Sequence, residues 1–487
     1  MKHDPDPPVA VAIHRLADAP NPTRKRWAYA TIVGCWLVTL AINAPGHLSF
    51  DSIIQLNEAR TRSYMGFHPP LMSYLMMLFD TIAPGTALFL LFMQALFFGA
   101  LLIVVRMARD VSVLTPLVVL ACCAHPFVLL YQGIVWKDVL FANFAVFGFA
   151  LLFAAARLRG WGRYACYAFS LLCVACGGLV RQNASIALPV LAVAIAYLEF
   201  PSLSLRAQAA KFLGGAVAAV IVMLAVGSGM DALILASAKV SPGPTYGMAL
   251  VVLGRYDVSG IIAHNDKANV SVFEKRRLDV PLLREDADRY YTPERLDWLP
   301  KRFLEELRKL PREEFIPAWG QFAVDNFGAY LRHRLEVFHW MIWPPDITHC
   351  LPLHVGITGP PDVMAKLDVP TTLRPSDRTL AAYTAYFMPT PLYRHGSFLV
   401  VAVLLCVLLP LRYGLNAALP VLALSAAGIL FTLTWTLTGV ACDIRYMYFL
   451  PLAVFACLVM ATVLEAERAA GARKPAPPHI PGGDRHA

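Results

Sequence analysis

Long apolar runs dominate this chain, and they restrict it to a membrane-embedded helical fold. A helix rises about 1.5 Å per residue, so one that crosses a bilayer needs roughly 17–25 mostly apolar residues. Runs of this kind recur from one end of the sequence to the other. The sequence predicts about ten membrane-spanning helices, near residues 27–45, 86–106, 112–132, 139–157, 164–180, 184–200, 212–236, 396–412, 416–438 and 446–465.

The composition agrees with a polytopic all-α membrane protein that also carries one extramembrane segment. The 487 residues are 57% hydrophobic and 15% charged, whereas soluble domains carry about 25% charged residues. The net charge of +9 comes largely from short loops, where the positive-inside rule accounts for it. A nucleic-acid partner is not expected, since no basic helix or aromatic RNA-binding motif is present.

Basic residues in the short loops predict the orientation of the chain. They fall on one side if ten spans alternate, which predicts a multi-pass protein of the inner (plasma) membrane with both termini cytoplasmic. Residues 1–26 do not resemble a cleavable signal, so the first span is expected to remain as an anchor. The basic residues are Arg24, Lys25, Arg26, Arg106, Arg109, Arg157, Arg159, Arg163, Arg206, Lys211, Arg412, Arg468, Arg473 and Lys474.

The outer loops then include residues 46–85, 133–138, 181–183, 237–395 and 439–445. Between the seventh and eighth spans, the extracytoplasmic segment is predicted to be mainly helical, with amphipathic helices at 301–310 and 313–343. Those helices suit either the bilayer surface or packing on one another. The domain plan is a cytoplasmic tail at 1–26, seven spans in 27–236, the outer segment 237–395, three spans in 396–466 and a disordered tail at 467–487.

Two shorter features complete the plan. Residues 69–82 are apolar but too short to span, so they predict an interfacial or re-entrant helix that begins at Pro69-Pro70. Eight of the ten cysteines lie in apolar runs and behave as small hydrophobes, without the flanking ligands of a zinc site. Cys350 and Cys442 lie outside or at the edge of the apolar runs; nothing in the sequence fixes whether they are paired.

Polar motifs gather at the predicted outer ends of the spans, where charges are costly unless they face water or a partner. Asp51, in the first outer loop, suits a general base or, alternatively, a cap for the helix that follows. His68 would lie at the membrane surface, either contacting a phosphate or sugar or playing no role. Lys137 and Asp138 open the fourth span, where they suit phosphate binding or purely structural roles at the helix start.

Two arginines are out of place on the outer side, where the orientation rule disfavours positive charge. Arg181 stands between two apolar runs, and Arg445 belongs to the motif Asp443-Ile444-Arg445-Tyr446. A guanidinium can grip phosphate or carboxylate oxygens, so each arginine suits either a phosphate headgroup or a buried pair with an aspartate. Asp257 adds a further outer carboxylate, as a binding residue or as part of a turn.

Together these motifs resemble the GT-C superfamily of membrane glycosyltransferases, which includes the dolichyl-phosphate-mannose protein mannosyltransferases and the bacterial aminoarabinose transferases. Asp51 to His68, Lys137-Asp138 and Tyr256-Asp257 also resemble related uncharacterised bacterial multispan proteins. The matching features are a cytoplasmic N-terminus, an acid in the first outer loop (Asp51), an outer helix near 69–82, a large late outer segment and the Asp443-x-Arg445-Tyr446 entrance to the last span. Many family members carry paired acids in the first loop, whereas Glu58 is the next carboxylate after Asp51 here.

The resemblance implies transfer of a sugar from a polyprenyl-phosphate donor to a lipid, glycan or protein acceptor on the outer face. The expected path is a single displacement, which would invert the anomeric centre. Asp51 would be catalytic. His68, Lys137, Asp138, Arg181, Asp257, Asp443, Arg445 and Tyr446 would bind substrate. No cofactor or metal is predicted. The alternatives are a transporter or flippase of a charged or lipid-linked substrate, and a lipid-linked glycan ligase or polymerase.

Overall fold

The computed structural model describes residues 22–64, 69–200 and 248–472, together with single positions between 214 and 229. The regular secondary structure of these residues is helical, with isolated β-bridges and no named strand among them. The predicted seventh span at 212–236 lies outside the continuously described residues. The all-α prediction is therefore confirmed for the described part of the chain.

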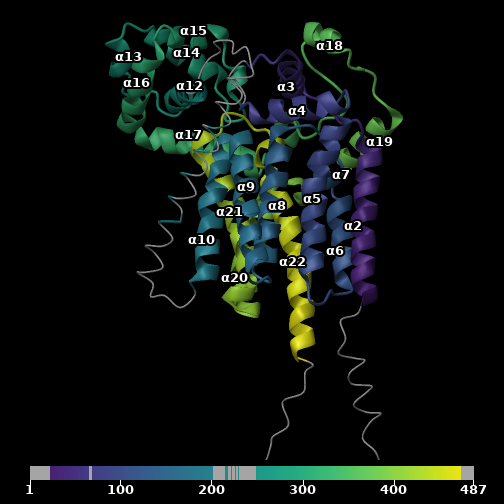
Figure 1. Cartoon of the computed structure of the whole chain (residues 1–487). Helices are drawn as coiled ribbons and strands as arrows, with labels where there is room; N and C mark the ends of the chain where they lie inside the picture. The colour runs from purple at the N-terminus through teal and green to yellow at the C-terminus, as the bar shows by residue number, and fades with distance from the viewer. Residues whose placement is uncertain are drawn as a thin grey trace, which may run out of the picture.

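The long helices run side by side as a bundle (Figure 1). Six described helices are long and apolar enough to cross a membrane, at 87–107, 137–155, 161–180, 395–413, 415–438 and 444–471. The chain is therefore a membrane protein. The bundle helices are α2 (Pro22–Asn43), α5 (Ala87–Met107), α6 (Leu114–Ala124), α7 (Pro126–Leu129), α8 (Lys137–Ala155), α9 (Trp161–Val180), α10 (Ala187–Glu199), α20 (His395–Tyr413), α21 (Leu415–Thr438) and α22 (Phe449–Ala472).

The third predicted span, 112–132, is not one straight helix. It divides into α6 and a second piece that starts at Pro126, and the two are bent by 68°. Proline cannot donate a backbone hydrogen bond and disfavours a helical conformation at the residue before it. His125 is accordingly extended, and its Nδ1 accepts the Phe127 amide as an N-terminal cap. Beyond the bend the chain continues through Tyr131–Gly133 into α8, whose first residues are Lys137 and Asp138.

α8 forms the centre of the bundle, and α20 lies at its periphery. Within the most apolar stretch of each helix, 89% of α8 is buried but only 17% of α20. A helix that is hydrophobic on all sides belongs in a core or in a membrane, and these two helices illustrate the two cases. The outward side chains of α20 include Val400, Leu404, Val407, Leu408 and Leu411.

Shorter helices cover one end of the bundle, which we call the capped end (Figure 1). The first residues of α2 and the last residues of α22 lie at the opposite end. The cap consists of α3 (Phe50–Thr61), α4 (Leu71–Ile82), α12 (Met248–Ala263), α13 (Ser271–Glu274), α14 (Val280–Tyr290), α15 (Lys301–Arg308), α16 (Arg312–Asp325), α17 (Phe327–Ile342), α18 (Pro361–Leu367) and α19 (Pro375–Phe387), with short 3-10 turns at 296–298, 347–350, 391–393 and 444–447.

The cap confirms several predicted elements and corrects one. α4 is the predicted short helix near 69–82, and α15 to α17 fall within the predicted amphipathic stretches. Asp257, however, lies in the middle of α12 rather than in a turn. The Pro-rich stretch 344–376 contains one short α-helix, α18, because Pro360 and Pro361 suit the first positions of a helix.

A disulfide bond joins Cys350 of the cap to Cys442, directly before the last long helix. It links positions separated by 92 residues in the sequence. Nearby, the Cys442 amide donates to the Glu294 carbonyl, at 2.5 Å, and the Arg295 guanidinium donates to the His349 carbonyl at 2.8 Å. The entrance to α22 is thus fastened to the cap by both covalent and hydrogen bonds.

Candidate functional site

The first loop of the capped end is held between two other chain segments. On one side, the His47 amide donates to the Gly133 carbonyl at 2.8 Å, and the Val135 amide donates to the His47 carbonyl at 3.0 Å. On the other side, the Leu48 amide donates to the Gly356 carbonyl at 2.9 Å. Gly133 permits this approach, because a Cβ there would lie 1.9 Å from the Asn43 side chain. The loop that leads into α3 is therefore fixed on both sides.

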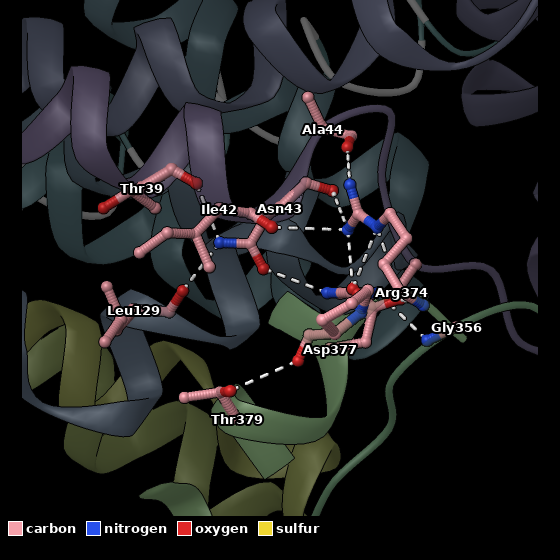
Figure 2. Close-up of polar contacts among 11 residues, drawn as sticks. Thr39, Ile42, Asn43, Ala44, Leu129, Gly356, Arg374, Asp377 and Thr379 are labelled. Carbon is pink, nitrogen blue, oxygen red and sulfur yellow. Dashed lines mark hydrogen bonds and ion pairs between the residues drawn. The ribbon is translucent and has the colours of Figure 1, made fainter.

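Arg374, at the start of α19, closes the C-terminal end of α2 (Figure 2). Its guanidinium donates to the carbonyls of Ile42 and Asn43 at 3.3 Å, and also to the Ala44 carbonyl. Asp377 accepts from the same guanidinium at 2.7 Å and so orients it. The last carbonyls of a helix lack internal partners and carry partial negative charge, which a cation at this position offsets.

His47 is held in its neutral form beside this cap. The Asn43 amide group donates to the carbonyls of Thr39 and Leu129, both at 2.8 Å, which leaves its Oδ1 to accept from His47 Nε2 at 3.0 Å. His47 Nδ1 accepts the Gly356 amide at 3.0 Å. With one nitrogen donating and the other accepting, the ring has no place for a second proton, and burial lowers the pKa of His47 to about 4.

Asp51 lies in the first turn of α3, and a distant residue binds its carboxylate. Asp51 Oδ2 is 2.9 Å from Arg445 Nη1. The start of α3 is fixed by Ser52, whose hydroxyl donates to the Val135 carbonyl at 2.5 Å, and by Ser49, whose hydroxyl accepts from Trp136 Nε1 at 2.7 Å. Asp51 keeps 22% of its side chain exposed, so it can be reached from solvent.

Arg445 bridges two carboxylates and stacks on two aromatic rings. Its Nε donates to Asp443 Oδ2 at 2.8 Å, while Nη1 faces Asp51. The guanidinium carbon lies 5.1 Å from the ring centre of Trp136 and 5.5 Å from that of Tyr446. Such stacking orients a guanidinium without using its donors, which remain directed at the carboxylates.

Arg181 repeats this arrangement, and it shares the Tyr446 ring with Arg445. It forms an ion pair with Asp138 in the first turn of α8. Its guanidinium carbon is 4.8 Å from the ring centre of Trp435 and 5.1 Å from that of Tyr446. The rings of Trp435 and Tyr446 are themselves stacked, 4.9 Å apart. Tyr446 thus contacts both guanidinium groups.

Lys137 completes the group, because it interacts electrostatically with Arg181, Asp51, Arg445 and Asp443. We call the six charged residues the charged cluster. It joins the starts of α3 and α8, the end of α9 and the approach to α22. Its members are Asp51, Lys137, Asp138, Arg181, Asp443 and Arg445.

The charged cluster contains three cations and three carboxylates, so its formal charges balance. Arg445 already binds two carboxylates, and Arg181 binds one. An incoming anion can therefore gain the donors that now face a carboxylate by taking that carboxylate's place. Asp51 is the carboxylate most easily replaced at Arg445, because its side chain is 22% exposed whereas that of Asp443 is 5% exposed.

Asp257 belongs to a different network, inside the cap. Its carboxylate accepts from Trp319 Nε1 at 3.0 Å and lies 3.2 Å from His333 Nε2, and it also pairs with Arg334. The Tyr291 hydroxyl lies 2.7 Å from the other nitrogen of His333. The side chains of Asp257, His333 and Arg334 are buried, and burial lowers the pKa of His333.

The structure therefore brings together seven of the nine residues singled out from the sequence: the charged cluster and Tyr446. Asp257 joins the buried network of the cap, and His68 lies outside the described residues. Sequence reasoning included Trp136 in the motif with Lys137 and Asp138 but gave it no role, and it missed Trp435; the rings of both face the two arginines. Aromatic residues near the ends of apolar runs are usual at membrane interfaces, so only their position beside unexpected arginines could have marked them.

Comparisons with protein-family models, with curated proteins and with solved structures found no match to this chain. Within the described ranges, no three or more His, Cys, Asp or Glu side chains are grouped as metal ligands. The candidate site is therefore defined by its own geometry: paired arginines on aromatic rings, beside a partly exposed aspartate at one end of a membrane bundle.

Proposed function

We propose that the protein is an integral membrane glycosyltransferase that moves a sugar from a polyprenyl-phosphate donor to a lipid, glycan or protein acceptor. The observation that carries the proposal is the ion pair between Asp51 and Arg445. It brings together a candidate base and a candidate phosphate-binding group that lie near opposite ends of the sequence. The GT-C resemblance suggests the donor class, and the geometry of the charged cluster supports the roles assigned below.

In this proposal, the donor phosphate binds Arg445 in place of Asp51, with Arg181 and Lys137 contributing further positive charge. Arginine suits this role because its planar group can bind two phosphate oxygens. The exchange also releases the Asp51 carboxylate from its ion pair. The donor would thereby free the base that the second substrate needs.

The reaction is then a single displacement at the anomeric carbon. An acceptor hydroxyl attacks that carbon while Asp51 takes its proton, and the bond from carbon to phosphate oxygen breaks. The electron pair of that bond leaves with polyprenyl phosphate, whose added charge the arginines stabilise. One displacement inverts the anomeric centre.

The disulfide supports an extracytoplasmic position for the capped end. Disulfide bonds persist in oxidising compartments and are rare in the cytosol, and Cys350 and Cys442 both lie at this end. The basic loop residues, such as Arg106 and Arg412, belong to the opposite side in the positive-inside orientation. Both arguments support a position of the charged cluster at the outer face of a plasma membrane, where lipid-linked sugars could reach it.

The test is a transfer assay with purified protein in liposomes, supplied with polyprenyl-phosphate sugars and a crude lipid and glycan extract. Wild type should release polyprenyl phosphate, and Asp51→Asn should lose about 100- to 10,000-fold in rate, the usual contribution of a general base. Asp288→Asn, an exposed change on α14, is the matched control. Wild-type rates in folded Asp51→Asn would remove Asp51 from catalysis.

Product analysis separates the alternatives. Transfer of whole glycan blocks would identify a ligase or polymerase that uses the same donor class. Absence of any release by correctly folded wild-type protein would favour a transporter or flippase, and uptake of labelled substrate by the liposomes would then be the next measurement.

A further inference from the structure

We infer that α17 lies in the surface of the lipid bilayer at the capped end and anchors the cap to the membrane. This inference does not depend on the proposed reaction. α17 runs across the base of the cap, level with the ends of the long helices (Figure 1). Its position therefore suits a helix that lies in the plane of a membrane rather than one that crosses it.

The C-terminal end of α17 is fixed to the bundle. It packs against α20 and α21, both long enough to span a membrane. The contact with α20 is close, because a Cβ at Gly396 would lie 2.7 Å from the Trp343 ring. The bilayer determines the depth of α20 and α21, because both are long enough to span it. Since α17 is packed against them, its own depth relative to the bilayer is fixed as well.

One side of α17 is occupied by the rest of the cap. His333, Arg334, Val337 and Met341 are buried, and His333 packs closely on Gly260 of α12. Arg334 also donates to the Gly439 carbonyl at 2.7 Å, at the end of α21. These contacts prevent rotation of the helix about its axis, so its remaining sides have a fixed direction.

A second side of α17 exposes large apolar side chains at intervals of four residues. Phe327 is 61% exposed, Leu331 44% and Leu335 52%. Residues spaced by four lie on one face of a helix, so the three form a stripe. Arg332, Glu336 and His339 border this stripe along a shallow hollow, and Arg332 pairs with Glu336 at 3.1 Å. An apolar stripe beside a charged edge is the pattern of an interfacial helix.

The lipid bilayer is the occupant that this surface fits. Leu430, Leu433 and Leu437 project from α21, and they lead along an apolar helix toward the end where α17 packs. Exposed apolar side chains are therefore present on α17 and on the long helix α21 against which it packs. Exposure of the three large apolar side chains of the α17 stripe to water is unfavourable in free energy. Acyl chains at the headgroup boundary would cover them and remove that cost.

Fluorescence quenching in vesicles tests this inference. Leu331→Trp is compared with Glu305→Trp, which places the same ring on an exposed position of α15, away from the base of the cap in Figure 1. Full-length variants are reconstituted in phosphatidylcholine vesicles with and without brominated acyl chains, and the wild-type signal is subtracted. Brominated lipid should quench the added emission of Leu331→Trp and leave that of Glu305→Trp unchanged.

Aqueous iodide provides the opposite measurement. Iodide should quench Glu305→Trp and spare Leu331→Trp. Quenching of Leu331→Trp by iodide alone would show that the stripe faces water, and protection from both quenchers would show that another protein segment covers it. Either result would overturn the inference, and neither bears on whether the protein transfers sugars.

Discussion

Arg445 holds Asp51 at 2.9 Å even though one residue precedes the last long helix and the other follows the first. Each side chain is a charge at the end of an apolar bundle, where an opposite charge lowers the cost of its position. Their pairing therefore joins the first loop of the capped end to the approach to the last helix.

Replacing Arg445 by Gln should destabilise the protein by about 3–5 kcal/mol, since removal of one partner of a buried pair leaves an uncompensated charge. Thermal unfolding in detergent micelles measures the loss. Arg412→Gln, which removes an exposed pair with Glu465, should stay close to wild type. The double variant Arg445→Gln with Asp51→Asn should recover part of the loss; strictly additive losses would show that the pair contributes no coupling.

Asp257→Asn should lower stability by about 3–5 kcal/mol, because Arg334 and His333 would then be buried without their carboxylate. The apparent KM of this variant for the lipid-linked donor should not change, since the Asp257 carboxylate is already bound by residues of the cap and does not face the charged cluster. A raised KM with unchanged stability would instead assign Asp257 to substrate binding.

Stability should fall as the pH drops from about 6.5 toward 4. His47 has its pKa lowered to about 4 in the folded protein, so the unfolded chain binds more protons across this interval. A shift of that size corresponds to about 3 kcal/mol at most. Unfolding of His47→Gln across the same pH range checks the assignment, because a slope equal to that of wild type would mean that His47 makes no contribution.

The double change Cys350→Ser with Cys442→Ser should cost about 2–4 kcal/mol. A membrane-impermeant maleimide should label these cysteines in intact cells only after reduction, and the double variant should lose that labelling. Labelling that requires cell lysis would place the capped end in the cytosol and reverse the proposed orientation.

The sequence predicted the helical bundle because the length of an apolar run is a direct consequence of bilayer thickness. It did not predict the bend before Pro126, since the run 112–132 is continuous in hydropathy. It also missed the two-sided support of the loop at His47, because the hydrogen bonds to Gly133 and Gly356 involve backbone groups that any residue possesses.

The candidate site was partly predictable for a related reason. Asp51, Arg181 and Arg445 attract attention because charge at the end of an apolar run is rare, and a shared side is enough to predict their proximity. Asp257 shows the limit of this reasoning. Its partners Trp319, His333 and Arg334 lie in other helices of the cap, and no spacing in the sequence connects them.

The closure of α2 by Arg374 has a consequence for how the protein is made. The guanidinium and the Ala44 carbonyl that it caps are 330 residues apart. At about 5–20 residues per second, synthesis of the intervening chain takes roughly 20–70 s. During this time the last carbonyls of the first helix lack the Arg374 guanidinium as a hydrogen-bond partner. The loop that carries Asp51 can therefore take its final position only when translation is well past its midpoint.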